Sequence, residues 1–345
     1  MAEVIDLLAN LTANRDRERV DVSFVQALMS LLQCERVAVY RLVGEAEEWR
    51  WLLCARMDRG EIAPLSDPPW VDFHSLPAKQ DAPWREECVT RQGMVIAPES
   101  VDPPHQLSAF PLTGDPTSAT VVEFTTVDPL NTQALRTIQT LLRIYGNFQG
   151  LLDYSQRDTL TGLFNRKTFD DAFYKSAQQT ADAALETDDG RRQAHAQRHF
   201  LGVVDIDHFK HVNDQYGHLI GDEVLLLVAR ILRSTFRFQD QLYRFGGEEF
   251  VIMLRCDGEA EALQAFERFR HNMENFAFPQ VGRVTVSLGF TEVVPGDTPA
   301  AAFERADKAV YYAKQNGRNQ VHSQAELVRI GALEDASKVG DVELF

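Results

Sequence analysis

The sequence is poor in cysteine. Its 345 residues contain four, Cys34, Cys54, Cys88 and Cys256, which are widely separated and form no C-x-x-C pair. This spacing disfavours a disulfide framework and a zinc ribbon. We therefore expect reduced thiols and a cytoplasmic protein.

Long apolar runs and excess basic charge are also missing. No run approaches the roughly 18 apolar residues that a membrane helix needs, and residues 1–20 lack the basic and apolar segments of a secretory signal. Lys and Arg number 35 against 51 Asp and Glu, so the net charge is −16. Because duplex binding needs a basic face, we expect no DNA partner. Because no apolar run is long enough to span a membrane, we expect no membrane partner either. A nucleotide pocket remains possible, since a few local cations can hold phosphates.

The length allows about two domains, and proline usage divides the chain. Eleven of the 14 prolines lie between Pro64 and Pro129. Around this stretch the apolar pattern predicts a helix and four strands, at residues 18–33, 36–42, 50–56, 93–97 and 119–126. This order resembles a GAF-type sensor domain, so residues 1–131 are predicted to be a GAF-like regulatory domain whose ligand is unknown.

A long helix is predicted at residues 132–155, connecting the two domains. Its apolar residues fall near the a/d spacing of a coiled coil; they are Leu135, Ile138, Leu142, Tyr145 and Leu152. Gln149 interrupts this stripe. The pattern favours a connecting helix that pairs with a second copy of the chain.

Strands alternate with helices in residues 156–322, which predicts an α/β (α+β) domain. The expected elements are helices at about 166–178, 220–236, 259–275 and 299–315, strands at 200–207 and 283–290, and a hairpin at 241–254. The polar segment 179–198 is predicted to be a solvated insertion. The tail 323–345 has no strong pattern.

The stretch RFGGEEFVIML, residues 244–254, carries the strongest signal. Gly246 and Gly247 separate two strand-like runs, as in a hairpin turn that needs positive φ. Two glycines also allow the backbone to approach a ligand. Glu248 and Glu249 follow and alternate sides of the strand. The alternative is a solvated turn that happens to contain these residues.

A second stretch, VVDIDHFKHVNDQYGHLIGDEVL, spans residues 203–225. An apolar strand ends there in Asp205 and Asp207, and carboxylates at such a strand end suit Mg²⁺, which binds best when substrate phosphates complete its shell. Lys210 is near enough in sequence to contact a phosphate. The alternative is an acidic turn between a strand and a helix.

Together, six segments resemble the GGDEF family of diguanylate cyclases. They are DTLTGLFNR (158–166), DIDHFKHVND (205–214), GHLIGDEVL (217–225), RFGGEEF (244–250), SLGF (287–290) and ADKAVYYAKQNGRNQV (306–321). The resemblance implies a nucleotidyl-cyclase or palm-like fold that converts two GTP into cyclic di-GMP and two pyrophosphates. Glu248 stands where many members have Asp, and both residues occur in active members.

The resemblance also implies the catalytic roles. Asp205, Glu248 and the main-chain carbonyl of Ile206 would hold two Mg²⁺ ions, for which Mn²⁺ could substitute. Glu248 would also accept the proton of the 3′-hydroxyl. Glu249 would support the metal site.

Asn213 and Asp222 match the positions that read guanine. A carboxylate can accept from guanine N1–H, which adenine lacks. The alternatives are a capping Asn and a surface Asp, or a cyclase with a different base choice, against which Asp222 argues. Further GTP contacts are implied for Phe209, Lys210, His218, Gly246, Gly247, Lys314 and Arg318. Lys314 and Arg318 are expected to share a face of the last helix, as i,i+4 neighbours.

Arg237 and Asp240 form an R-x-x-D pair ahead of the hairpin, in the register of the family's inhibitory site for its own product. Arg268 matches a secondary arginine of that site. Arginine can bind a guanine edge or a phosphate bidentately. The alternative is an exposed ion pair of little energetic weight.

Two other groups of residues leave alternatives open. The first could bind zinc, although non-ligand histidines are favoured: His208, His211 and His218. The second could line a ligand pocket or touch haem, although simple packing is favoured: Trp70, His74, Trp84 and His105.

Because each active site would hold one GTP, two domains must face each other, which predicts a C2 homodimer. The competing hypothesis is a non-catalytic receptor for cyclic di-GMP or GTP. Retention of Asp205, Glu248, Asn213 and Asp222 favours the enzyme.

Overall fold

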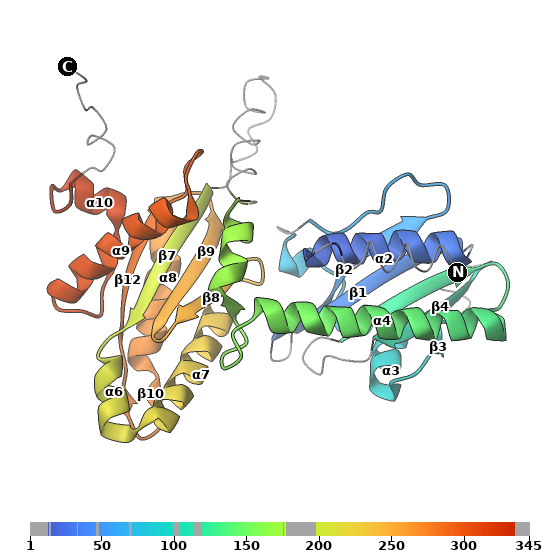
Figure 1. The fold of residues 1–345 in the computed structure, drawn as a ribbon, viewed down its shortest axis with the longest axis horizontal. Helices are drawn as coiled ribbons and strands as arrows, with labels where there is room; N and C mark the ends of the chain where they lie inside the picture. The colour runs from blue at the N-terminus through green and yellow to red at the C-terminus, as the bar shows by residue number, and fades with distance from the viewer. Residues whose placement is uncertain are drawn as a thin grey trace, which may run out of the picture. The chain divides into compact units, whose positions relative to one another are not determined.

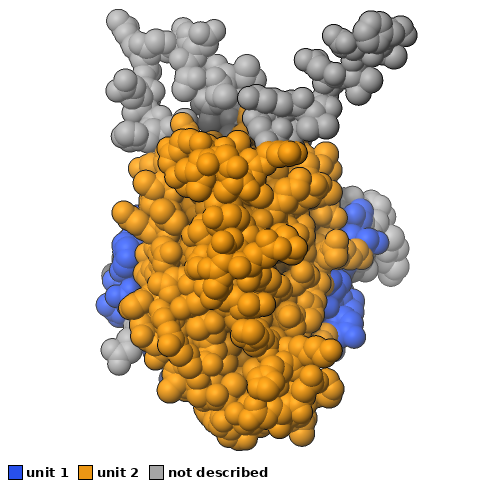
Figure 2. All heavy atoms as spheres, turned by 90° about the vertical axis from the view of Figure 1, so that its left-hand side faces the viewer, with its two compact units in different colours: residues 1–155 blue, residues 156–345 orange. Residues whose placement is uncertain are grey.

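The computed structural model describes residues 13, 15–32, 34–45, 48–68, 71–98, 104–112, 119–174, 176 and 198–334. The chain divides into two compact units, residues 1–155 and 156–345 (Figures 1 and 2). The boundary between the units falls after Ser155. The predicted connecting helix belongs to the first unit. Of the predicted insertion 179–198, all but Arg198 lies outside the described residues, as do residues 335–345 of the tail.

The first unit contains an antiparallel sheet in the order β2-β1-β5-β4-β3. Its strands are β1 (Arg36–Glu45), β2 (Glu48–Asp58), β3 (Val95–Ile96), β4 (Gln106–Leu112) and β5 (Thr120–Thr126). Its helices are α2 (Arg17–Leu32), α3 (Pro83–Arg91) and α4 (Thr132–Gln156), with short 3-10 turns η1 (Phe73–Ser75) and η2 (Lys79–Asp81). The long α4 runs along the unit beside the sheet (Figure 1).

The predicted helices at 18–33 and 132–155 are confirmed, but β4 was missed. Pro111 lies within β4, opposite Val121 of β5, and proline usually argues against an interior strand. Only Ala109 and Ser108 of β4 pair with the two-residue β3. Pro111 is therefore beyond the reach of β3, where its missing N–H is not needed for pairing.

The apolar stripe of α4 packs inside the first unit. Ile138, Leu142, Tyr145 and Leu152 are buried in one core with Phe24 and other residues of α2 and the sheet. The Phe24 and Tyr145 rings stack with their centroids 3.9 Å apart. The prediction that this stripe forms the seam between two copies is thus wrong, because its own unit uses the surface.

Gln149, which interrupts the stripe in the sequence, is also buried. Its side-chain amide and the Tyr145 hydroxyl both donate to Asp21 Oδ1, the amide at 2.6 Å. Arg41 Nη2 donates to the other Asp21 oxygen at 3.2 Å. A buried carboxylate of α2 therefore ties the polar positions of α4 to β1 within the first unit.

The opposite face of this sheet holds a buried ion pair beneath α3. Glu123 of β5 accepts from Arg85 Nε at 2.6 Å, Arg85 Nη2 at 3.0 Å and Trp84 Nε1 at 2.7 Å. The Arg85 guanidinium also lies 3.4 Å from the centroid of the Tyr40 ring. Trp84 thus packs, as favoured by the sequence, while His74 is exposed and Trp70 lies outside the described residues.

The second unit contains a mixed sheet in the order β13-β12-β7-β9-β8-β6. Its strands are β6 (Phe164–Asn165), β7 (Arg198–Ile206), β8 (Gln241–Gly246), β9 (Glu249–Cys256), β12 (Val286–Glu292) and β13 (Val321–Ser323), and a separate pair is β10 (Ala277–Phe278) and β11 (Gly282–Arg283). Its helices are α6 (Phe209–Tyr216), α7 (His218–Thr235), α8 (Glu259–Asn275), α9 (Pro299–Gln315) and α10 (Gln324–Arg329), and residues 166–174 are also helical. The sequence missed α6, β13 and α10.

Side chains of β7 alternate between two cores, as a period of two requires. Phe200, Val204 and Ile206 join the core under α7 and α8, whereas Leu201 and Val203 join the core under α9. Asp205 has the same parity as Leu201 and Val203. It is therefore placed on the α9 face, at the carboxyl end of β7.

All four cysteines are free thiols. Among the helices of the described residues, none is both long enough and apolar enough to cross a membrane.

We predict that Glu123→Ala lowers the free energy of unfolding of the first unit by about 3–5 kcal/mol, because it leaves a buried guanidinium without a counter-charge. Urea unfolding followed by tryptophan fluorescence measures this. Glu86→Ala is the control, since Glu86 forms an exposed ion pair with Lys79, and it should cost less than about 1 kcal/mol. Equal losses in the two variants would contradict the assigned weight of the buried pair.

Candidate active site

Two carboxylates come together where β7 ends beside the β8–β9 turn. Asp205 lies opposite Glu249 in the β7–β9 ladder, and Glu248 occupies the turn just before β9. The Ile206 N–H donates to the Glu248 carbonyl at 3.4 Å. Gly246 and Gly247 precede Glu248 with φ of 139° and 50°, values that favour glycine. The predicted hairpin thus brings Glu248 to the end of β7.

The electrostatics of these groups indicate a shared site. Lys314 Nζ of α9 lies 2.7 Å from Asp205 Oδ2. Burial raises the pKa of Asp205 and the Asp207 charge adds to this, while Lys314 opposes it. Burial and then the Asp205 charge raise the pKa of Glu248, again against Lys314. The site therefore contains two carboxylates in mutual repulsion beside one ammonium group.

The hairpin is braced by residues to which the sequence assigned no role. Arg244 Nη2 donates to the Gly247 carbonyl at 2.9 Å, and Arg244 Nη1 donates to Asp158 at 3.0 Å. Asp158 also accepts from the N–H and hydroxyl of Thr161 at 2.8 and 2.7 Å. These residues lie in the segments that resemble the GGDEF family, and that resemblance is the feature of the sequence that could have identified them. Arg244 and Asp158 hold the turn that carries Glu248.

The two guanine-reading candidates lie on adjacent helices. Asn213 is half-buried on α6, and Asp222 is exposed on α7. Gly217, with φ of 84°, ends α6 and precedes α7. A methyl group on Gly221 would collide with the Asn213 side-chain oxygen. The Asn213 side chain thus packs directly on the backbone of Gly221, the residue that precedes Asp222.

The other nucleotide candidates differ in exposure. Phe209 is buried in the core under α7 and α8. Lys210, His218, Gly246, Gly247 and Arg318 are exposed, and Lys314 is half-buried. Phe209 therefore supports α6 from within the core.

The expectation that Lys314 and Arg318 share a helical face is wrong. α9 ends at Gln315, and Gly317 and Arg318 have φ of 112° and 60°. The Arg318 N–H turns back to the Ala313 carbonyl at 2.9 Å. The glycine allows the helix to end in a left-handed turn, so Arg318 is presented by a turn and not by the helix.

Asp207 follows β7 directly, and both of its carboxylate oxygens accept hydrogen bonds from the protein. It is 5% exposed. Ser287 Oγ donates to Oδ1 at 2.7 Å, while Thr285 Oγ1 and the Asn319 N–H donate to Oδ2 at 2.7 and 3.0 Å. The contacts of Asp207 therefore differ from those of Asp205, which pairs with Lys314.

The predicted inhibitory residues also lie together. The Arg237 N–H donates to Asp240 Oδ2 at 2.8 Å, and Arg268 Nη2 donates to the Thr235 carbonyl at 3.1 Å. Burial raises the pKa of Asp240 to about 6, against the neighbouring Arg237 and Arg268. The exposed Arg237 guanidinium pairs with Glu261 at 3.1 Å. A ligand that binds Arg237 would compete with Glu261.

The histidines considered for zinc are all exposed: His208, His211 and His218. Within the described part of the chain, no three His, Cys, Asp or Glu side chains converge as a ready-made metal site.

Comparison with known proteins identifies the second unit. The family model described as the diguanylate cyclase GGDEF domain matches residues 155–320. Over these residues the second unit is therefore similar to a GGDEF domain. The segments that form the site described above all lie within this match, from Asp158 to Asn319.

Two curated relatives illustrate the similarity. The chain is 37% identical over 169 residues to diguanylate cyclase DgcZ of Escherichia coli (strain K12), covering 48% of this chain and 52% of that protein. It is 38% identical over 167 residues to diguanylate cyclase DgcP of Pseudomonas aeruginosa, covering 48% and 23%. The chain thus spans about half or less of the length of these relatives.

Among solved structures, the chain is similar to the GGDEF domain of DgcB from Caulobacter crescentus in complex with c-di-GMP. The sequence identity is 32% and the TM-score is 0.43, covering 50% of this chain and 96% of that one.

Proposed function

We propose that this protein is a diguanylate cyclase, which condenses two GTP into cyclic di-GMP and two pyrophosphates. The observation that carries the proposal is the convergence of Asp205 and Glu248 at the end of β7, with Lys314 2.7 Å from Asp205. The GGDEF match to residues 155–320 supports the same reaction.

The donor set fits divalent metal ions. Asp205 and Glu248 supply hard carboxylate oxygens and Ile206 supplies a main-chain carbonyl, a set that suits Mg²⁺ or Mn²⁺ when phosphates complete the shell. The Lys314 ammonium already holds a positive charge against Asp205. When bound, two such ions would neutralise charge on the α-phosphate and the leaving pyrophosphate.

The chain's own residues would handle the proton and the nucleotide. The 3′-oxygen of one GTP attacks the α-phosphorus of the other, the bond to pyrophosphate breaks, and Glu248 accepts the hydroxyl proton. The raised pKa of Glu248 favours proton uptake. Asn213 and Asp222 would bind guanine, while Lys210, Lys314 and Arg318 would bind phosphates. Glu249, opposite Asp205, would support the metal site.

The reaction requires two copies, so the proposal includes a homodimer. Because the buried stripe of α4 is already used, we assign the contact to its remaining exposed apolar residues, Leu151 and Tyr154, which are 65% and 76% exposed. They lie near the end of α4, close in sequence to the cyclase domain. Pairing there would bring two cyclase domains into one assembly.

The first unit is proposed to be a GAF-like sensor whose ligand is unknown. Its five-stranded antiparallel sheet, covered by helices on both faces, supports this. The free cysteines support the cytoplasmic location proposed from the sequence. Because α4 is part of the core of the sensor, a change in that core would act on the helix that precedes the cyclase domain.

Product inhibition is proposed at Arg237, Asp240 and Arg268. The two arginines approach a carboxylate that accepts a main-chain N–H. When the product binds, the Arg237 guanidinium would release Glu261 and bind the product instead.

Glu248→Ala should lower the rate of cyclic di-GMP formation about a hundredfold or more, because it removes the proton acceptor and a metal ligand. Purified protein is incubated with GTP and Mg²⁺, and products are separated by chromatography. Lys314→Ala should also lower the rate, whereas Lys308→Ala, which removes an exposed ion pair with Glu304 on the same helix, should not. Cyclic di-GMP from Glu248→Ala at the wild-type rate would refute the assignment.

The double substitution of Leu151 and Tyr154 by Glu should convert the dimer to a monomer and abolish turnover, because it places charges in an apolar contact. Sedimentation velocity gives the oligomeric state. Gln133→Glu, exposed at the other end of α4, is the control. A double variant that remains an active dimer would show that the contact lies elsewhere.

Arg237→Ala should keep a constant rate while product accumulates, whereas the wild-type rate should fall, because the variant lacks the guanidinium that binds the product. Progress curves with added cyclic di-GMP measure this. Arg230→Ala, an exposed arginine of α7, should behave as wild type. Equal inhibition of Arg237→Ala and wild type would place the inhibitory site elsewhere.

A further inference from the structure

The turn that carries Arg318 is held in an unusual backbone conformation. Gly317, Arg318 and Asn319 have φ of 112°, 60° and 50°. Two of these residues are not glycine, and side-chain-bearing residues rarely adopt such angles. Such a turn persists only where its surroundings determine it.

Asp207 supplies one of the contacts that hold this turn in place. Its Oδ2 accepts the Asn319 N–H at 3.0 Å and the hydroxyl of Thr285, just before β12, at 2.7 Å. Its Oδ1 accepts the hydroxyl of Ser287 in β12 at 2.7 Å. The Asp207 N–H also donates to the Thr285 carbonyl at 2.9 Å. The carboxylate therefore links the end of β7, the segment entering β12, and the turn after α9.

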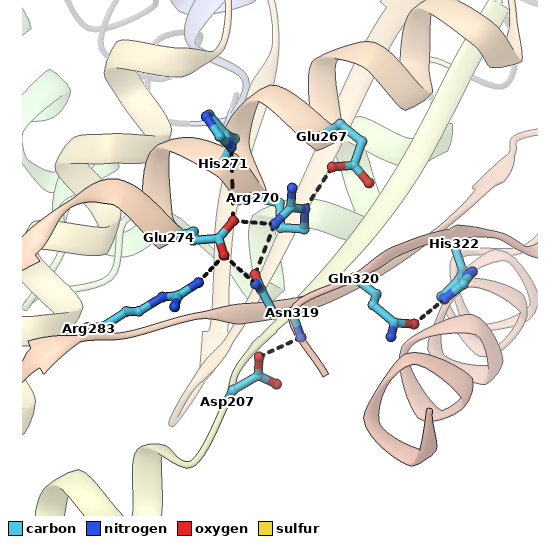
Figure 3. Close-up of polar contacts among 9 residues, drawn as sticks. All are labelled: Asp207, Glu267, Arg270, His271, Glu274, Arg283, Asn319, Gln320 and His322. Atoms are coloured by element: carbon cyan, nitrogen blue, oxygen red, sulfur yellow. Dashed lines mark hydrogen bonds and ion pairs between the residues drawn. The ribbon is translucent and has the colours of Figure 1, made fainter. Parts of the chain in front are cut away.

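The Asn319 side chain supplies the second restraint (Figure 3). Its amide donates to Glu274 Oε1 at 3.0 Å, and its oxygen accepts from Arg270 Nη1 at 3.2 Å. Arg283 and Arg270 both pair with Glu274. Asn319 is thus fixed from β7 through its backbone and from α8 through its side chain, which leaves Arg318 exposed between them.

We infer that Asp207 is a positioning residue, which holds the Asn319 N–H so that the left-handed turn presents Arg318 to the nucleotide phosphates. This rests on the proposed function, in which Arg318 binds phosphate. The inference gives Asp207, which follows β7, a different role from Asp205, which lies within β7. Asp205 faces Lys314 and the reaction, whereas Asp207 acts through hydrogen bonds that an amide side chain can also make.

The test is a double-mutant cycle on the affinity for a non-hydrolysable GTP analogue, measured by calorimetry on the full chain with Mg²⁺. Asp207→Ala and Arg318→Ala should each weaken binding about tenfold. The coupling between them should then also be about tenfold, which is typical of neighbouring groups. The double variant should bind no more weakly than Arg318→Ala. Additive losses, or wild-type affinity in Asp207→Ala, would overturn the inference.

Asp207→Asn keeps the inference testable if Asp207→Ala does not fold. Its oxygen can accept the Asn319 N–H while its amide donates to Ser287, so binding should stay within about twofold of wild type. A loss as large as that of Arg318→Ala would overturn the inference, because it would show that the charge of Asp207 is what matters. Cyclic di-GMP formation by wild type is measured separately, and its absence would refute the proposed function while the binding cycle still decides the role of Asp207.

Discussion

The carboxylates of Asp205, Asp207 and Glu248 lie at or beside the end of β7, and each needs its own compensation. A buried charge without a partner is costly, and carboxylates near one another repel. Asp205 is compensated by Lys314, and Asp207 by two hydroxyls and an N–H. Glu248 is half-buried and has its pKa raised by burial and by Asp205. Lys314 is the one ammonium group beside Asp205 and Glu248, so the two carboxylates together still favour the binding of cations.

This compensation depends on how closely α9 approaches the sheet. A methyl group on Gly289 of β12 would collide with the Ala306 carbonyl and the Val310 N–H of α9. The glycine lets the helix backbone lie directly on the strand. Lys314, one turn beyond Val310, can then reach Asp205 of the neighbouring strand. The apolar packing of α9 and the electrostatics of the site are consequences of the same contact.

In the first unit, α4 is both a core helix and the element that leads into the cyclase domain. Tyr145 and Gln149 bind Asp21, while Ile138 and Leu142 pack with α2. A change in the packing of this core would therefore act directly on α4. The same packing means that a fragment starting at residue 132 would expose an apolar face.

Sequence reasoning found the parts of the fold that have strong periodicity. The strand ending in Asp205, the hairpin with its two glycines, and α9 were placed correctly because alternation, turn residues and apolar spacing agree there. The eight-residue α6 was missed, since it is short and begins after His208, which has φ of 59°. The helix predicted at about 299–315 ends where α9 ends, so the i,i+4 spacing of Lys314 and Arg318 was applied to a residue beyond the helix.

Tertiary partners were the information that the sequence did not carry. The stripe of α4 has coiled-coil spacing, but nothing in the pattern shows whether the partner is another copy or the same unit. Likewise, the strand-end pattern alone does not distinguish Asp205 from Asp207, and only the family resemblance gave a role to Asp205. The structure shows what Asp207 does instead, since it accepts the Asn319 N–H while Asp205 pairs with Lys314.

The most direct test of this account is a titration with Mn²⁺ in the presence of a non-hydrolysable GTP analogue, with bound ion counted by electron paramagnetic resonance. Wild type, Asp205→Asn and Asp207→Asn are compared. The account predicts that Asp205→Asn loses bound Mn²⁺, because a carboxylate ligand is replaced by a neutral amide, while Asp207→Asn retains it. Full occupancy in Asp205→Asn, or loss of Mn²⁺ in Asp207→Asn, would contradict the division of roles between the two acidic residues.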